Sequence, residues 1–186
     1  MTIACIDVGY TESESKPTRA IAACVVISDW RDAASSSEHV VHLTDVQAYQ
    51  PGEFYRRELP CIQAVLAELS HKPSCIVIDG YVWLDDLDNP GLGAHLHQSL
   101  AESIPVIGVA KNPFTRSEHA TALTRGGSTR PLYITAAGVP IAQAVHNIAA
   151  MHRPLRFPSI LQRVDRLSRG EQPMQSSAHS TSKRSR

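Results

Sequence analysis

The sequence lacks any long apolar run, and this absence argues against a membrane protein. No segment of the 186 residues is apolar over the length that a bilayer-spanning helix requires. The first residues, MTIACIDVGY, also lack the basic stretch followed by an apolar stretch that marks a secretory signal. Hydrophobic residues make up 42% and charged residues 19%, which is typical of a globular domain with a buried core. We expect a cytoplasmic protein with no membrane partner.

Two signatures of cofactor chemistry are also missing. No C-x-x-C or C-x-H spacing, which a zinc site would need, occurs around the four cysteines. We therefore expect buried, reduced thiols at Cys5, Cys24, Cys61 and Cys75. There is also no Walker-type glycine-rich loop that ends in lysine, so the sequence does not predict a P-loop nucleotide site.

The formal net charge is zero, but the charges are distributed unevenly. Residues 1–110 contain 15 acidic and 6 basic residues, a balance of −9, whereas residues 111–186 contain 3 acidic and 12 basic residues, a balance of +9. Clustered Lys and Arg residues neutralise phosphates, so this asymmetry is one sign of a polyanion-binding protein. A soluble surface with a basic tail would give the same counts, and charge alone does not separate the two interpretations.

Hydrophobic periodicity divides the chain into two parts. In the first part, polar connections at 11–18 and 28–38 join three segments with strand patterns, at residues 3–8, 20–27 and 40–46. In the second part, strand patterns at 75–78, 106–109 and 132–135 alternate with helical patterns at 57–69, 92–100 and 141–151. This order predicts an α/β fold in which an antiparallel meander is followed by parallel strands and helices flank the sheet.

The composition changes near residue 170. Residues 170–186, GEQPMQSSAHSTSKRSR, contain almost no large apolar side chains, so burial would not offset the entropy cost of ordering them. We expect one domain over residues 1–169, followed by a disordered basic tail over residues 170–186.

Three carboxylates occupy distinctive positions. Asp7 ends the first apolar strand, Asp79 ends the buried run CIVID before Gly80, and Glu58 lies near the start of a helix. If the two strands are neighbours, Asp7 and Asp79 emerge at the same edge of the sheet, where oxygen ligands suit a hard cation. Such a cation activates water for attack at phosphorus. Taken singly, each carboxylate also fits a turn or a helix cap, which is the commoner role of an Asp before Gly.

A strand that ends in Asp-x-Gly also begins the phosphate-binding hairpin of actin-like ATPases and sugar kinases. The chain is too short for the two lobes of those proteins. Phosphotransfer of the actin type is therefore the weaker alternative.

A series of motifs resembles the endonuclease V family. The stretch AYQPGEFYRRELP is similar to the family's wedge segment, in which Tyr-x-Pro-Gly leads into a helix with Arg-Glu and Pro. Further similar segments follow in the family's order and at near-family spacing: CIVIDG, GLGAHLHQSL, IPVIGVAKNPF, RPLYITAAG and RFPSILQRVD. Together they extend over residues 45–168.

The resemblance implies a ribonuclease H-like fold and a Mg²⁺-dependent endonuclease, with Mn²⁺ as a substitute, that cleaves DNA or RNA beside deaminated (inosine) bases. By position, Asp7 and Asp79 would bind the metal directly, and Glu58 would bind it directly or through water. Lys111 would contact a phosphate, and Asp165 lies where the family has a further Asp or His. We also expect a monomer.

The same resemblance assigns residues to nucleic-acid binding. Tyr49 and Pro51, with Gly52, would form the wedge that fills the gap left by an extruded base. Gly80 and Lys111 are also assigned to nucleic-acid binding. Considered alone, Tyr49 would be a half-buried aromatic at a strand end, and Lys111 a solvated lysine.

The chain departs from the family pattern after Gly80. It has YVWLDDLDNPGLG, with Val82 where a Gly is expected and without the family's His. Bulk at Val82 would restrict the backbone approach that base recognition needs. Asp85, Asp86 and Asp88 add negative charge, either as metal ligands or as a solvated loop, and we favour the loop. The alternative function is a catalytically impaired nucleic-acid-binding homologue with an altered base pocket.

Overall fold

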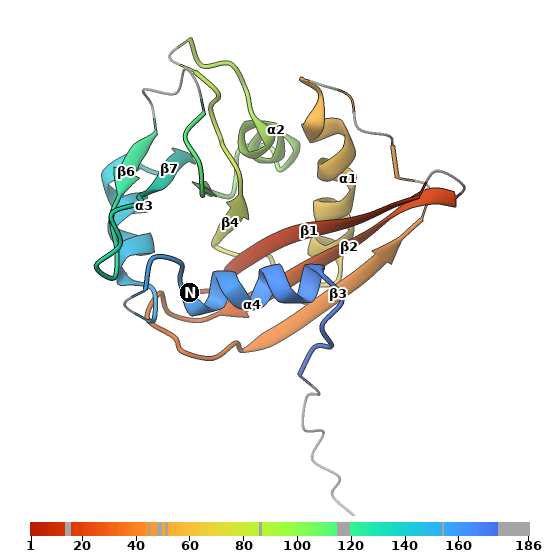
Figure 1. The fold of residues 1–186 in the computed structure, drawn as a ribbon, viewed down its shortest axis with the longest axis horizontal. Helices are drawn as coiled ribbons and strands as arrows, with labels where there is room; N and C mark the ends of the chain where they lie inside the picture. The colour runs from red at the N-terminus through yellow and green to blue at the C-terminus, as the bar shows by residue number, and fades with distance from the viewer. Residues whose placement is uncertain are drawn as a thin grey trace, which may run out of the picture.

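The computed structural model describes residues 1–174, except residues 14, 15, 45, 48, 49, 51, 86, 115–119 and 154. A seven-stranded mixed sheet forms the centre, with helices on both of its faces (Figure 1). Along the sheet, the strand order is β3-β2-β1-β4-β5-β7-β6. The predicted α/β class, with an antiparallel meander followed by parallel strands, is confirmed.

The meander consists of β1 (Ile3–Ser13), β2 (Lys16–Ile27) and β3 (Ser37–Leu43), all antiparallel. These strands are longer than the apolar pattern predicted, and most of the expected connection at residues 11–18 belongs to the hairpin arms. The ladder continues past the core because its hydrogen bonds join backbone groups, whatever the side chains. The third strand also begins and ends about three residues earlier than predicted.

Parallel pairing begins where β4 (Cys75–Asp79) joins β1 and continues with β5 (Val106–Ala110). The strand at 132–135 was predicted to continue the parallel part, but β7 (Leu132–Ala137) runs antiparallel to β5, because the described residues between the two form no crossover helix. Strand β6 (Thr121–Leu123) was not predicted; it is three residues long and mostly exposed, so it carries no apolar signal.

Each face of the sheet has its own core and its own pair of helices. Helices α1 (Phe54–Ala67) and α2 (Leu92–Ser99) pack on the side of Ile6, Ile76 and Val106. Helices α3 (Ile141–Ala150) and α4 (Ser159–Ser168) pack on the side of Cys5, Val77 and Ile107. Since side chains alternate along a strand, residue parity in β1, β4 and β5 decides which pair of helices a side chain meets.

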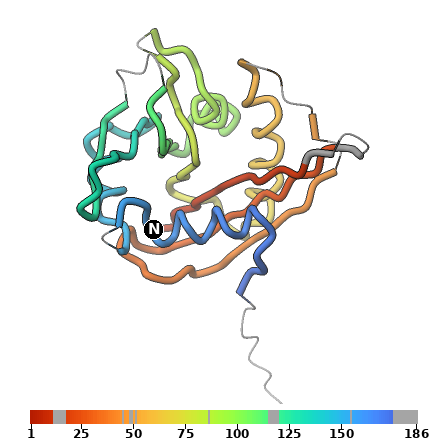
Figure 2. Tube along the Cα trace, viewed as in Figure 1, coloured from red at the N-terminus to blue at the C-terminus, as the bar shows by residue number. Residues whose placement is uncertain are grey.

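Helix α4 was not predicted as a helix, although its buried residues recur at helical spacing: Ile160, Leu161, Val164, Leu167 and Ser168. It lies along β1 and β2 of the meander (Figure 2). Residues 171–174, which we had assigned to the disordered tail, contact it: Glu171 forms ion pairs with Arg163 and Arg166. Residues 175–186 lie outside the described residues.

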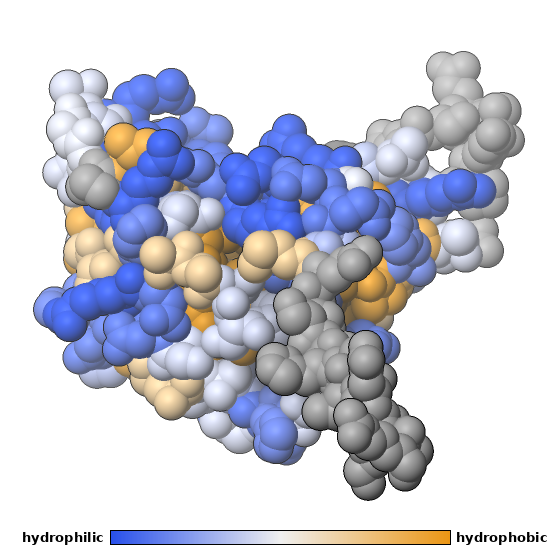
Figure 3. Space-filling model, turned by 90° about the horizontal axis from the view of Figure 1, so that it is seen from below, coloured by the Kyte–Doolittle hydropathy of each residue, from blue (hydrophilic) through white to orange (hydrophobic). Residues whose placement is uncertain are grey.

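The outer surface is mainly polar. On the face shown in Figure 3, hydrophobic side chains appear only in small patches among polar ones. No helix in the described part of the chain has the length and apolar composition needed to cross a membrane. The four cysteines are buried and unpaired, as predicted.

Candidate metal and nucleic-acid site

Asp7, Asp79 and Lys111 come together where the parallel pairing of β1, β4 and β5 ends: Asp79 is the last residue of β4 and Lys111 follows β5, whereas Asp7 lies within β1, which continues to Ser13. In the β1–β4 ladder Ile6 lies opposite Ile78, so Asp7 and Asp79 follow side by side on strands about 4.8 Å apart. Asp79 in turn pairs with Val109, two residues before Lys111. All three side chains have the parity of the face that α4 covers. Asp7 and Asp79 are thus neighbours, as expected, but the prediction that Asp7 ends its strand is wrong, because β1 continues to Ser13 in its antiparallel pairing with β2.

Helix α4 adds Asp165 to this edge. The Lys111 ammonium lies between two carboxylates: its Nζ is 3.0 Å from Asp79 Oδ2 and 3.1 Å from Asp165 Oδ1. The aromatic ring of Phe157 packs against the same ammonium, 4.6 Å from Nζ to the ring centre. Asp165 also pairs with Arg169, one turn further along α4, with Nε 3.0 Å from Oδ2.

Glu58 reaches the site from the opposite face, on the second turn of α1. The residue is only 5% exposed, and its Oε2 has no hydrogen-bond partner among the described residues. Burial and the charges of Asp7 and Asp79 hold the pKa of Glu58 well above its usual range. The neighbouring Arg57 partly offsets this shift, but its guanidinium stacks over the Tyr10 ring, 3.7 Å from the ring centre.

The carboxyl groups of the site differ in the direction of their pKa shifts. Burial raises the pKa of Asp7, with further increases from Asp79 and Asp165, against a hydrogen bond from Ser168. Burial acts in the same direction on Asp165, but hydrogen bonds from Lys111 and Arg169 outweigh it and lower the pKa. For Lys111, burial is outweighed by Asp79 and Asp165, so its pKa is raised. Asp7 and Glu58 are therefore carboxyls whose ionised form is disfavoured in the folded chain, whereas that of Asp165 is favoured.

In the part of the chain that the structure describes, no three Asp, Glu, His or Cys side chains lie close enough to hold one metal ion as they stand. Lys111 forms ion pairs with both Asp79 and Asp165. The donor chemistry nevertheless fits a hard divalent cation: the groups offer carboxylate oxygens, one buried oxygen has no partner among the described residues, and burial, with a smaller contribution from neighbouring carboxylates, raises the pKa values of Asp7 and Glu58. Assignment of Asp7, Glu58 and Asp79 as metal ligands stays a prediction.

The predicted nucleic-acid residues are only partly described. Tyr49 and Pro51 lie outside the described residues. Gly52 is exposed just before α1 with φ 80°, a conformation that favours glycine. Gly80, with φ 135°, turns the chain away from the end of β4, and its amide donates to the carbonyl of Val109 over 3.2 Å.

The departures after Gly80 have structural explanations. Val82 is fully buried and its side chain packs against Gly93 of α2, so its bulk lies in the core. Asp85 accepts hydrogen bonds from the amides of Leu87 and Asn89, at 3.0 and 3.3 Å. This supports the loop interpretation of Asp85. Asp86 is outside the described residues.

Sequence reasoning missed two groups that hold the site. Ser168 Oγ lies 2.5 Å from Asp7 Oδ2. Arg156 binds the carbonyls of Lys111 and Pro131, at 2.5 and 2.9 Å, and so fixes the loop that carries the Lys111 side chain. The segment RFPSILQRVD drew attention to this region, but these contacts join residues far apart in the chain and have no local signal.

A mixed sheet with carboxylates on neighbouring central strands, where their parallel pairing ends, and helices on both faces defines a ribonuclease H-like protein. The sequence narrows this class further. Residues 1–158 match the family model described as Endonuclease V, and the chain belongs to the endonuclease V family.

Relatives in sequence and structure agree with this assignment. The endonuclease V of Streptomyces coelicolor is 35% identical over 130 residues, which are 68% of this chain and 51% of that protein. One from Xylella fastidiosa strain Temecula1 is 36% identical over 110 residues, 59% of this chain and 43% of the relative. The chain thus spans about half the length of these relatives.

Among solved structures, the endonuclease V of Streptomyces avermitilis superposes with a TM-score of 0.71 at 26% identity, covering 91% of this chain and 80% of its own. The Ciona intestinalis endonuclease V, solved with a 24mer DNA containing an inosine followed by a ribo-adenosine, gives a TM-score of 0.75 at 17% identity. That match covers 90% of this chain and 84% of the Ciona protein, and it supports the fold.

Proposed function

We propose that this protein is a metal-dependent endonuclease that hydrolyses phosphodiester bonds in nucleic acid. The observation that carries the proposal is the buried Glu58 carboxylate, which lacks a described partner for Oε2 and lies within the field of Asp7 and Asp79. Leaving a buried charge uncompensated is costly, so such a cluster serves best as a binding site for a cation supplied from outside. Membership of the endonuclease V family favours the same conclusion.

The residues have distinct roles in this proposal. Asp7 and Asp79 hold Mg²⁺, or Mn²⁺ in its place, directly, and Glu58 holds it directly or through water. The bound cation would activate a water for in-line attack at phosphorus and stabilise the leaving oxygen. Lys111 binds a phosphate of the substrate. When its ammonium moves from Asp79 to that phosphate, Asp79 becomes available as a metal ligand. Asp165 keeps Lys111 at the site throughout.

The substrate class is nucleic acid, and we infer cleavage near inosine. The inference rests on the family and on the Ciona relative solved with inosine-containing DNA. Tyr49, Pro51 and Gly52 are the proposed wedge, and Gly80 is the proposed neighbour of the extruded base. The protein acts as a monomer in this proposal.

The test is incubation of the full chain with plain and inosine-containing DNA and RNA, each with Mg²⁺, with Mn²⁺ and with EDTA. We expect cleavage that requires the metal and falls on the order of a thousandfold in Asp7→Ala, because a lost metal ligand removes several kcal/mol of transition-state stabilisation. The matched control is Asp85→Ala, whose carboxylate binds loop amides. Absence of cleavage of all four substrates, or equal cleavage by Asp7→Ala, would refute catalysis.

One observation favours a second candidate, a nucleic-acid-binding homologue without catalysis. Lys111 engages both Asp79 and Asp165, and within the described residues no three ligand side chains converge. In that case native protein would bind nucleic acid without cleaving it, and Asp79→Ala would bind as well as the native chain. A fluorescence-anisotropy titration beside the cleavage assay separates the two functions.

A further inference from the structure

Helix α4 comes unusually close to β1 at Gly9. A Cβ added to Gly9 would lie 2.1 Å from the carbonyl oxygen of Ser168, whereas real Cβ atoms essentially never come within 3.0 Å of another atom. The backbone of Gly9 does not have a positive φ. The glycine at this position is therefore explained by the close approach of the helix, and any larger residue would displace the end of α4.

This close approach delivers the Ser168 hydroxyl to Asp7. Ser168 is 2% exposed, and its Oγ lies 2.5 Å from Asp7 Oδ2. The same oxygen is 2.8 Å from the backbone carbonyl of Asp165, three residues earlier in the helix. A hydroxyl has one proton to donate, and a carboxylate is a stronger acceptor than a neutral carbonyl. The shorter contact to Asp7 is therefore the bond that an ionised Asp7 receives.

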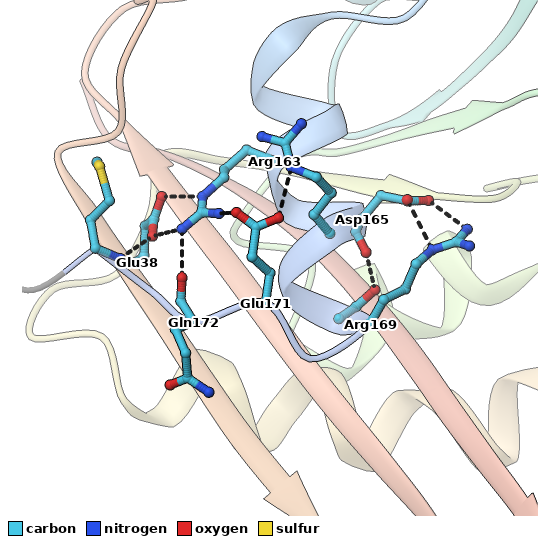
Figure 4. Close-up of polar contacts among 9 residues, drawn as sticks. Glu38, Arg163, Asp165, Arg169, Glu171 and Gln172 are labelled. Carbon is cyan, nitrogen blue, oxygen red and sulfur yellow. Dashed lines mark hydrogen bonds and ion pairs between the residues drawn. The ribbon is translucent and has the colours of Figure 1, made fainter.

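The position of α4 along the sheet is fixed on another side by an ion pair. Figure 4 shows Arg163 between Glu38 and Glu171, while Asp165 and Arg169 lie on a different side of the helix. Arg163 binds Glu38 of β3 through two parallel hydrogen bonds of 2.9 and 2.8 Å. The helix that presents Ser168 is thus held both to β3 and to β1.

We propose that Ser168 is a positioning residue for Asp7. By donating to Oδ2, its hydroxyl fixes the rotation of the Asp7 carboxyl and leaves Oδ1 directed toward the divalent cation. The inference rests on the proposed function, since it assigns Asp7 to a metal ion. Hydrogen bonds from surrounding residues to metal ligands set ligand orientation, and their loss lowers metal affinity by about 10- to 100-fold.

The test measures Mn²⁺ binding to the full chain by titration calorimetry in native protein, Ser168→Ala, Ser168→Cys and Ser159→Ala. Ser159 is the matched control, because it is a serine of the same helix whose Oγ contacts His152 at 3.1 Å instead of Asp7. We expect Ser168→Ala to bind Mn²⁺ about tenfold more weakly. Ser168→Cys, a weaker donor, should be intermediate, and Ser159→Ala should match the native protein. Cleavage by Ser168→Ala should recover at saturating Mn²⁺.

The outcomes separate this inference from the function on which it rests. Equal Mn²⁺ affinity in native protein, Ser168→Ala and Ser168→Cys would overturn the positioning role and leave the nuclease proposal intact. A loss of thermal stability in Ser168→Ala without a change in Mn²⁺ affinity would show a purely structural hydroxyl, and would also overturn it. If neither the native protein nor Ser159→Ala binds Mn²⁺, both proposals fail.

Discussion

Two buried glutamates of this protein have opposite environments. The side chain of Glu38 is 2% exposed, and it receives two hydrogen bonds from Arg163 and one from the backbone amide of Met174. The hydrogen bonds from Arg163 are the main reason that its pKa is lowered. Glu58 is buried more completely, since the whole residue is 5% exposed whereas Glu38 as a whole residue is only partly buried. Its Oε2 has no hydrogen-bond partner among the described residues, and burial together with Asp7 and Asp79 raises its pKa.

Under the proposed function, the difference separates a structural carboxylate, Glu38, from a metal-binding one, Glu58. The charge of Glu38 is balanced within the chain, and the resulting pair attaches α4 to β3. Glu58 Oε2 has no hydrogen-bond partner among the described residues, and burial together with the charges of Asp7 and Asp79 disfavours its ionised form. Functional sites retain such unfavourable arrangements because a ligand compensates them when it binds.

The largest expected effect is on cleavage activity, which should depend on Glu58 and not on Glu38. Glu58→Gln should lower metal-dependent cleavage by roughly a thousandfold, because it weakens the hold on a cation that supplies several kcal/mol to the transition state. Glu38→Gln should retain activity when it is assayed well below its own melting temperature. Equal losses in the two variants would remove the distinction between structural and functional glutamates.

The next effect concerns the free energy of unfolding and the ion pair between Glu38 and Arg163. Arg163→Met leaves the Glu38 charge buried and unpaired, so we expect the free energy of unfolding to fall by about 3 kcal/mol. Glu38→Met combined with Arg163→Met should recover much of this loss, since it removes both charges. Urea denaturation measures the free energy of unfolding of the double variant and of each single variant, Arg163→Met and Glu38→Met. If the losses in the two single variants simply added up in the double variant, the two residues would not be a coupled pair.

The same pair has a defined pH dependence. The pKa of Glu38 is lower in the folded than in the unfolded chain, so the pair's contribution is present above the unfolded pKa and is lost as the pH falls through the folded pKa. The stability difference between native protein and Arg163→Met should therefore shrink in acid.

The smallest expected effect is the contribution of Glu58 to stability, which depends on pH in the direction opposite to that of Glu38. The raised pKa of Glu58 means that the folded protein favours the protonated form, so stability is highest below the unfolded pKa and declines as the pH rises through the folded pKa. In EDTA, Glu58→Gln should therefore be more stable than native protein at neutral pH by about 1 kcal/mol or more. The difference should vanish at low pH. Thermal unfolding measured from acid to neutral pH tests this prediction. A Glu58→Gln variant that is less stable than native protein at every pH would contradict it.

The fold could be predicted where apolar patterns were strong. The runs that end at Asp7 and Asp79 specified two buried strands, and the register of β1 on β4 brought the two carboxylates together as expected. The short strand β6 and the polar arms of the β1–β2 hairpin could not be predicted, because backbone hydrogen bonds rather than apolar side chains define them.

The site could be predicted only as far as local motifs reached. Asp7, Asp79, Lys111 and Asp165 converge, but the bond from Ser168 to Asp7 joins residues 161 positions apart. A serine near the end of an amphipathic helix has no feature that predicts such a bond. The role of Gly9 is hidden in the same way, because its reason is the backbone of α4 and not a turn.

The hydrogen bond between Ser168 and Asp7 also joins the first strand to the last helix, with consequences during synthesis. A nascent chain that has emerged as far as Ala150 already contains Asp7, Glu58, Asp79 and Lys111, but it lacks Asp165 and Ser168. Until α4 leaves the ribosome, the apolar residues of the uncovered face of β1 and β2 have no helix over them. Since domains generally fold as units, the site is completed only after α4 has been synthesised.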